Sequence, residues 1–267
     1  AQILIGVGDT LIVGRYSTEA LAALVLGTTI FFIIFIFGAG FSFAAMALVS
    51  TANTEGDNTK IRRITRMALW LSIAFGLLVS PIFVFSERLL LFLGQEFNLA
   101  ALASDYLIFS GIAIFPALSA SVLRCYLAGM EYVKVTFYIS IIAVLLNLLV
   151  NYLLVFGMFG LPELGIVGAG IATVFVNLFM FMSFVIYAKI KLPQHNLFIR
   201  FWRPDRGVIG LVLKMGSAIG ITSLAEAGLF SASSIMMGWV GQLELAAHGI
   251  ALQLASITFM LHLGLSD

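Results

Sequence analysis

Long apolar runs separated by short polar breaks dominate the chain from end to end. Because an α-helix rises about 1.5 Å per residue, about 20 apolar residues span the roughly 30 Å hydrocarbon core of a membrane. The runs therefore predict membrane helices over residues 1–14, 21–50, 64–86, 101–128, 132–157, 165–190, 207–239 and 245–267. We expect the first and last runs to be truncated within helices. The shorter amphipathic stretch 87–100 is predicted to lie at the membrane interface.

The composition supports a membrane protein. Hydrophobic residues make up 61% of the 267 residues and charged residues only 10%, with a mean hydropathy of +1.11. Soluble domains carry about 25% charged residues, so the predicted fold class is an all-α, polytopic helical bundle. The net charge of +1, without a basic stripe, argues against a nucleic-acid partner. The single cysteine excludes a disulfide framework within the chain and a cysteine-built metal site.

Basic residues are distributed unevenly among the polar breaks. The breaks 53–66, 124–134 and 189–214 carry 12 of the 14 Lys and Arg residues, whereas the intervening breaks carry only Arg15 and Arg88. Loops rich in Lys and Arg stay in the cytoplasm. The bias therefore predicts that the first helix starts in the cytoplasm and that Arg15, the stretch 87–100 and Pro162, which follow the first, third and fifth runs, lie outside.

A weak internal repeat suggests a two-lobe plan. A shift of 224 residues lays Gly14–Ser42 over Gly238–Ser266 with eight identities in 29 positions. Parallel repeats of six helices are one known plan of secondary transporters. We therefore predict a first six-helix lobe over 1–190, a cytoplasmic linker over 191–206 and the first two helices of a second lobe over 207–267, within a complete protein of twelve helices.

Few ionisable side chains fall inside the apolar runs. A charged group at the centre of a membrane helix costs about 2.5–3.5 kcal/mol on insertion scales, so such groups usually face a cavity or pathway. Asp9 and Glu226 are the best-placed carboxylates, one in each predicted lobe, and either can carry a proton or bind a cation. Asp105 begins its helix near the outside and is expected to be peripheral, while Asp267 is the last residue.

Neutral polar side chains recur at helical spacing in two other runs. Asn147 and Asn151 share one face of their helix, as Thr173 and Asn177 do on the next. Their oxygens can share a proton or cation site with a nearby carboxylate. The alternative is hydrogen bonding between packed helices; we favour the site for Asn151 and helix packing for Asn177.

At these positions the chain resembles the multidrug and toxic compound extrusion (MATE) family. The similar segments are Gly8–Gly14, Glu19–Ala23, Asn147–Tyr152, Gly157, Gly160, Leu164–Thr173 and Glu226. Some members of that family carry aspartate where this chain has Asn151, a departure that counts against a proton mechanism based on an aspartate pair.

The resemblance implies a twelve-helix exporter that exchanges inward Na⁺ or H⁺ for outward organic cations, drugs or other amphipathic compounds by alternating access. It implies no enzyme activity and no cofactor besides the coupling ion. It also implies that Asp9, Asn151 and Thr173 belong to a first-lobe site and Glu226 to a cation or substrate site in the second lobe. We predict that Asn147 completes the first-lobe site around Asp9, with Na⁺ as a candidate metal ion. We expect a multi-pass protein of the bacterial inner membrane that binds small molecules and lipid and acts as a monomer when full length.

Three other classes stay open as alternatives. A major-facilitator transporter shares the two-lobe plan, but residues 56–60 do not fit the pattern expected in its second-to-third loop. A lipid-linked oligosaccharide flippase of related fold is expected to line its cavity with basic residues, and none lies deep in a run. An intramembrane enzyme needs a nucleophile–base or metal constellation, and neither metal-ligand histidine spacing nor a nucleophile motif is present in the sequence.

The predicted topology can be tested by labelling single cysteines with an impermeant maleimide. Cysteines placed at Asn58 and Asn196 should react only from the cytoplasmic side, and one at Glu163 only from outside, because the basic breaks stay inside. Labelling of all three positions from one side would contradict the assignment.

Overall fold

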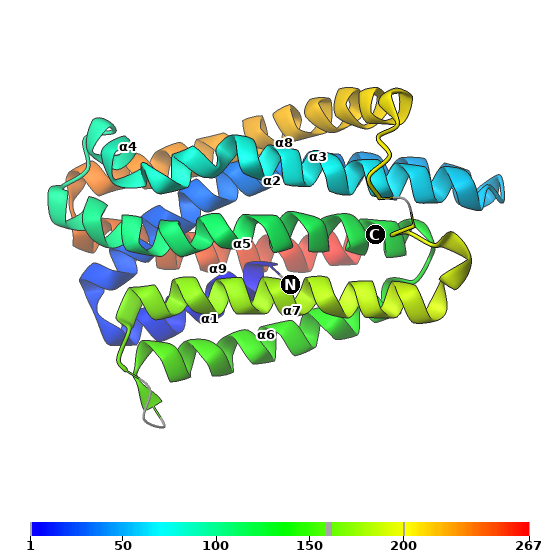
Figure 1. Cartoon of the computed structure of the whole chain (residues 1–267). Coiled ribbons are helices and arrows are strands. Elements are labelled where there is room, and N and C mark those ends of the chain that lie inside the picture. The colour runs from blue at the N-terminus through cyan, green and yellow to red at the C-terminus, as the bar shows by residue number, and fades with distance from the viewer. Residues whose placement is uncertain (1, 159–161, 200, 267) are drawn as a thin grey trace.

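A computed structural model describes residues 2–158, 162–199 and 201–266, without the side chains of residues 2–4, 257 and 259–266. Asp267 lies outside the described residues. Within these ranges the chain is built of helices joined by short turns, and no strand occurs (Figure 1). The helices are α1 (Gln2–Tyr16), α2 (Thr18–Thr54), α3 (Asn58–Val84), α4 (Ser86–Phe92), α5 (Phe97–Gly129), α6 (Val133–Val155), α7 (Gly165–Lys191), the 3₁₀ turn η2 (Pro193–His195), α8 (Arg206–Val240) and α9 (Gln242–Ser266).

The predicted runs each correspond to one long helix, with ends that differ by a few residues. Six of these helices, α2, α3, α5, α6, α7 and α8, are long and apolar enough to cross a membrane. The predicted fold class is thereby confirmed. The predicted interfacial segment 87–100 begins in the first turn of α4 but ends too late, because α4 ends at Phe92 and α5 already begins at Phe97. Gly94, at φ +82°, terminates the short helix, a backbone conformation that suits glycine.

Local capping sets where several helices begin. The Ser17 side chain accepts a hydrogen bond from the backbone N–H of Ala20 at the start of α2. Asp57 accepts from Thr59 and Lys60 at the start of α3, and Asp205 accepts from Val208 at the start of α8. Each cap satisfies an amide that has no partner within its own helix. The polar breaks in the sequence therefore double as helix starts.

The turns gather at two opposite ends of the bundle (Figure 1). The α2–α3 turn, the α5–α6 turn and the linker between α7 and α8 lie at one end. The α1–α2 turn, α4 and the α8–α9 turn lie at the other end. This alternation is the arrangement that the uneven distribution of Lys and Arg requires. We call the end that carries the α2–α3 turn, the α5–α6 turn and the linker the basic end.

Glycines bring α2 and α8 into backbone contact. A Cβ atom at Gly40 would lie 2.3 Å from the carbonyl oxygen of Gly216 and 2.7 Å from the nitrogen of Gly220. In the same way, a Cβ at Gly168 would lie 2.8 Å from the backbone of Leu154, so α7 closely approaches α6. Small residues allow this close packing of membrane helices.

The helix ends reproduce the internal repeat. Tyr16 ends α1 and Thr18 begins α2, while Val240 ends α8 and Gln242 begins α9, so both ends are offset by 224 residues. The packing follows the same relation: α2 packs against α8 and α1 packs against α9. If α1 is matched with α8 and α2 with α9, the α2–α8 contact corresponds to the α1–α9 contact. The division of the chain into two lobes stays a prediction.

The linker is docked onto the bundle by His195, which is only 1% exposed. Its Nδ1 is hydrogen-bonded to the hydroxyl of Tyr126 on α5, and its Nε2 lies 3.0 Å from Oδ1 of Asn58 on α3. Because the amide oxygen can only accept, Nε2 carries the proton and Nδ1 accepts from the tyrosine. Burial lowers the pKa of His195, which keeps the imidazole neutral in this arrangement.

We expect His195→Ala to lower the thermal midpoint of the purified protein, because Tyr126 and Asn58 lose their buried partner at a cost of about 1–3 kcal/mol. The wild-type protein should also lose stability as the pH falls below about 6.5, the ordinary pKa of histidine. There the unfolded chain takes up a proton that the folded chain excludes.

The pH-dependent part of this loss should be absent from His195→Ala and retained in His248→Ala, which changes a histidine outside the linker. Identical pH profiles for wild type and His195→Ala would contradict the assignment.

Candidate functional site

A buried carboxylate joins α1 to α6. Asp9 is 3% exposed, and Asn147 and Asn151 are fully buried. The side-chain amide of Asn147 donates to Oδ1 of Asp9 at 3.0 Å, and the amide of Asn151 donates to the same oxygen. The spacing of four residues places both amides on one face of α6, as the sequence predicted.

The charge of Asp9 has no cationic partner among the described residues. Among the described residues, the two ion pairs are Lys60–Glu55 and Arg63–Asp205, and both lie near the basic end. A buried carboxylate that is stabilised only by neutral donors remains poorly compensated. A bound proton or cation would supply the missing positive charge.

The site is rich in oxygen atoms that lack a hydrogen bond. Oδ1 of Asn147 and Oδ1 of Asn151 are buried and have no hydrogen-bond partner within the described residues. Buried polar atoms are usually satisfied, so a group of unsatisfied acceptors calls for an explanation. Carbonyl and carboxylate oxygens are ligands for hard cations. No group of three or more His, Cys, Asp or Glu suited to a metal occurs in the described ranges, so a cation here would rely on amide oxygens and one carboxylate.

Side chains of α7 and α5 lie around this cluster. Thr173 is buried and donates to the carbonyl of Ala169 at 3.0 Å, and the Asn177 amide donates to the carbonyl of Thr173 at 2.8 Å. Tyr106 of α5 is 2% exposed and lies near Asp9, with its hydroxyl close to the side chain of Thr173. Tyr106 was not predicted from the sequence. It directly follows Asp105, and nothing in the apolar pattern distinguishes it from a packing residue.

Gly8 is a second residue that the sequence did not single out as a site residue. A Cβ atom at this position would lie 2.7 Å from Cδ2 of Leu148 and 3.1 Å from Oδ1 of Asn147. Glycine therefore lets α1 approach α6 closely enough for Asp9 to reach both amides.

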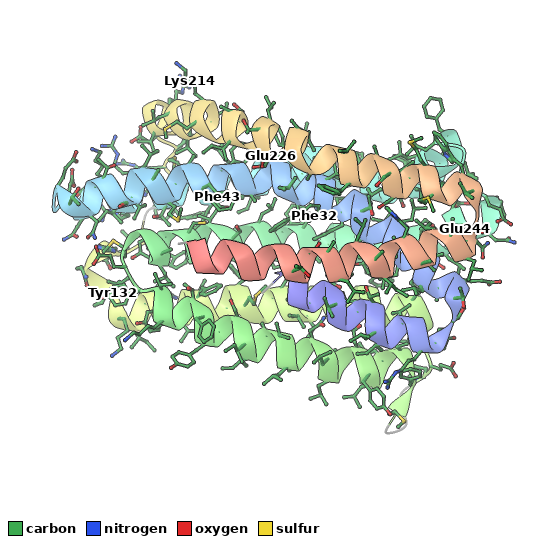
Figure 2. The ribbon with its side chains drawn as sticks, turned by 180° about the vertical axis from the view of Figure 1, so that it is seen from behind. Phe32, Phe43, Tyr132, Lys214, Glu226 and Glu244 are labelled. Atoms are coloured by element: carbon green, nitrogen blue, oxygen red, sulfur yellow. The ribbon has the colours of Figure 1, made fainter. Side chains whose placement is uncertain are left out.

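The structure does not bring the other predicted carboxylates to this cluster. Glu226 is exposed on α8, which packs against α2, α3 and α9 (Figure 2). Asp105 is also exposed, near the start of α5. The functional roles of Asp9, Asn147, Asn151, Thr173 and Glu226 stay predictions.

Comparisons with known proteins point in one direction. The profile of the MatE family matches residues 1–153. The chain is 47% identical over 269 residues to a protein of Agrobacterium fabrum named "Probable multidrug resistance protein NorM", covering 100% of this chain and 58% of that protein. It is 44% identical to a protein of the same name from Rhizobium meliloti, with the same coverage. The chain thus spans about 58% of the length of these curated relatives.

A solved structure has a similar fold. It is described as the inward-facing conformation of a multidrug resistance MATE family transporter of the MOP superfamily. The TM-score is 0.82 at 17% sequence identity, over 96% of this chain and 58% of that one. At this identity the likeness concerns the fold alone.

We expect Gly8→Ala to destabilise the purified protein by about 1–3 kcal/mol, the usual range for overpacking. The added methyl group would displace Leu148 and Asn147, and so part α1 from α6. Gly14→Ala on the same helix is the matched control, because its Cβ would come no closer than 3.3 Å to Leu21, compared with 2.7 Å to Leu148 for a Cβ at Gly8. Equal thermal midpoints for the two variants would show that the close α1–α6 contact is not needed.

Proposed function

The chain belongs to the MATE family of multidrug transporters, and on this premise we propose that the full-length protein is a cation-coupled antiporter. It would export organic cations, drugs or other amphipathic compounds across a bacterial inner membrane, with the basic end in the cytoplasm. Inward movement of Na⁺ or H⁺ would drive this export by alternating access.

One observation carries the proposal: a buried carboxylate lies beside unsatisfied amide oxygens and has no cationic partner in the described part of the chain. A coupling ion can drive a conformational change only if it binds one state better than the other. Asp9 offers such a difference, because it is poorly compensated without an ion and neutralised with one.

The asparagines suit this task because an amide can serve both states. With the ion absent, Asn147 and Asn151 present N–H groups to the carboxylate, as observed. Turning an amide about its last side-chain bond exchanges N–H for oxygen. With Na⁺ bound, the same side chains would present oxygens to the cation, and Thr173 would add a hydroxyl oxygen. With H⁺ as the coupling ion, the proton would bind the carboxylate directly.

Glu226 would act from the second lobe. Its side chain is exposed on α8, on a helix that contacts the first lobe through α2 and α3. We propose that it binds the cationic part of the substrate or the ion from the opposite wall of the transport pathway. Two acids in different lobes would let ion and substrate bind in different conformations.

Asp9→Asn and Glu226→Gln in the full-length protein should each reduce cation-driven dye efflux by about tenfold or more, because an interaction with a charged group is worth roughly 1.5–3 kcal/mol. Each substitution keeps the shape of the side chain and removes its charge. Asn151→Ala should weaken coupling less. Efflux and membrane expression are measured in the same cells.

Asp105→Asn is the control for charge removal, since Asp105 is exposed near a helix start, and it should leave efflux near the wild-type level. Retained efflux in both Asp9→Asn and Glu226→Gln would defeat the mechanism. A larger loss from Asp105→Asn would mean that the essential carboxylate is a different one.

A further inference from the structure

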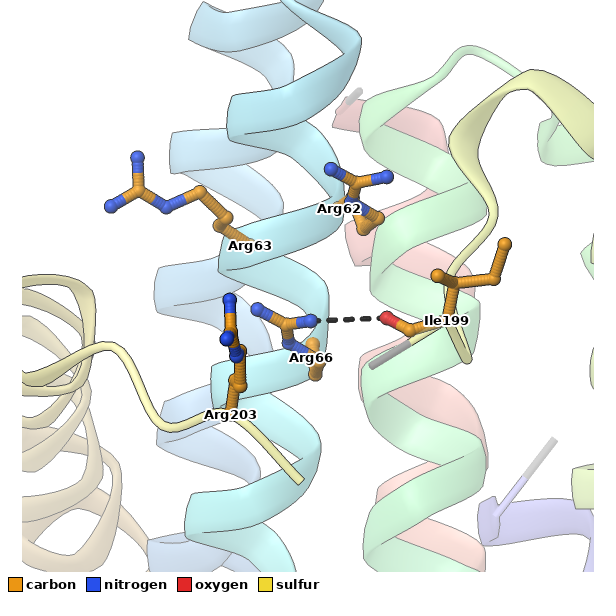
Figure 3. Close-up of a pocket in the computed structure, with 5 residues that line it drawn as sticks. All are labelled: Arg62, Arg63, Arg66, Ile199 and Arg203. Carbon is orange, nitrogen blue, oxygen red and sulfur yellow. Dashed lines mark hydrogen bonds between the residues drawn. The ribbon is translucent and has the colours of Figure 1, made fainter. Parts of the chain in front are cut away.

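Four arginines surround an open cavity at the basic end, on elements other than those that carry Asp9, Asn147 and Asn151. The cavity has a volume of about 370 Å³ and is lined by Arg62, Arg63, Arg66, Ile199 and Arg203. Arg62, Arg63 and Arg66 come from the first turns of α3, and the other two residues come from the linker (Figure 3). The cavity is therefore built between a membrane helix and the segment docked over it.

The positive charge around this cavity is only partly balanced. Arg63 pairs with Asp205, the N-cap residue of α8. Partial desolvation raises the pKa of Asp205, but the hydrogen bond from Arg63 and the amide of Val208 outweigh it and hold the pKa below its ordinary value, so this carboxylate is ionised at neutral pH.

The nearby acids are engaged elsewhere. Glu55 pairs with Lys60, and Asp57 caps the first amides of α3. Neither Arg62 nor Arg203 has an ion pair with any residue that the structure describes. The cavity thus holds more positive charge than the protein itself neutralises.

Contacts between α3 and the linker hold the cavity walls in place. Arg66 is 8% exposed, and its guanidinium donates to the carbonyl of Ile199 at 3.1 Å (Figure 3). One turn further along α3, the indole of Trp70 donates to the carbonyl of Phe201 at 2.8 Å and stacks on its ring. A site whose walls are already fixed loses little conformational entropy when a ligand binds.

The aromatic residues next to the cavity indicate its depth in the membrane. Trp70 is 39% exposed and Trp202 is 73% exposed, both beside the arginines in sequence. Tryptophan concentrates at the headgroup level of a bilayer, because the ring is apolar and its N–H is polar. The preference of tryptophan therefore favours a position of the arginines near the lipid phosphate groups.

We propose that this cavity binds the phosphate group of an anionic phospholipid headgroup from the leaflet at the basic end. Guanidinium groups bind phosphate oxygens through paired N–H donors, which suits arginine better than lysine. Basic pockets beside membrane helices at the interface are suited to anionic lipids. Arg62 and Arg203 would contact the phosphate, and Arg66 would position the linker. The bound lipid would bridge α3 to the linker and so join the first lobe to α8.

The test uses delipidated full-length protein in detergent and three probes: phosphatidylglycerol, phosphatidylcholine and soluble glycerol 3-phosphate. Binding is followed by native mass spectrometry and by the shift in thermal midpoint. The double variant Arg62→Gln/Arg203→Gln should bind phosphatidylglycerol about tenfold more weakly than wild type, as expected for two basic residues near an anionic headgroup. Lys134→Gln/Lys191→Gln removes the same charge from exposed positions of α6 and α7 and should bind like wild type.

Preference for phosphatidylglycerol over phosphatidylcholine, lost only in the arginine variant, supports the proposal. Equal binding of the two lipids, or an equal loss in the lysine control, overturns it. Binding of glycerol 3-phosphate at the arginines without binding of phosphatidylglycerol would assign the cavity to a soluble phosphate ester and overturn the lipid as its source. If the double variant does not fold, Arg203→Gln alone changes one exposed linker residue and is expected to show the same selective loss, reduced in size.

Discussion

A carboxylate held inside an apolar helix bundle is the constraint on which the packing of α1, α5, α6 and α7 depends. Asp9 is buried, and its hydrogen bonds come from α6. Helices α1 and α6 must therefore stay close and in register, which Gly8 allows. Gly168 and Gly170 in turn bring α7 against the backbones of α6 and α5. The close packing of this half of the bundle thus surrounds one polar group that would be unfavourable in any looser arrangement.

Much of the fold follows from the sequence for simple physical reasons. A membrane helix must be apolar over about 20 residues, so α2, α3, α5, α6, α7 and α8 stand out as uninterrupted runs. Lys and Arg accumulate at one end, which sets the alternation of the turns. The shared helical face of Asn147 and Asn151 also follows from spacing alone. Their proximity to Asp9 was inferred from chemical complementarity and family resemblance, because no local pattern relates residues about 140 positions apart.

Other features depend on tertiary contacts that leave no mark on the apolar pattern. The sequence indicates only that His195 belongs to the linker, yet the residue is buried between Tyr126 and Asn58. Tyr106 reads as helix packing, yet it lies near Asp9. The start of α5 at Phe97 depends on how Gly94 and Gln95 turn the chain, and Gln95 is held by a hydrogen bond to the carbonyl of Ile235 on α8. In each case the decisive partner is distant in the sequence.

The two amides that reach Asp9 share one helix and one acceptor oxygen. A rotation of α6 about its own axis would therefore move both donors away from the carboxylate together. Much of α6 is exposed at its outer surface, and its neighbours are chiefly α7 and α1. The hydrogen bonding of the carboxylate would consequently depend on the rotation of this one helix.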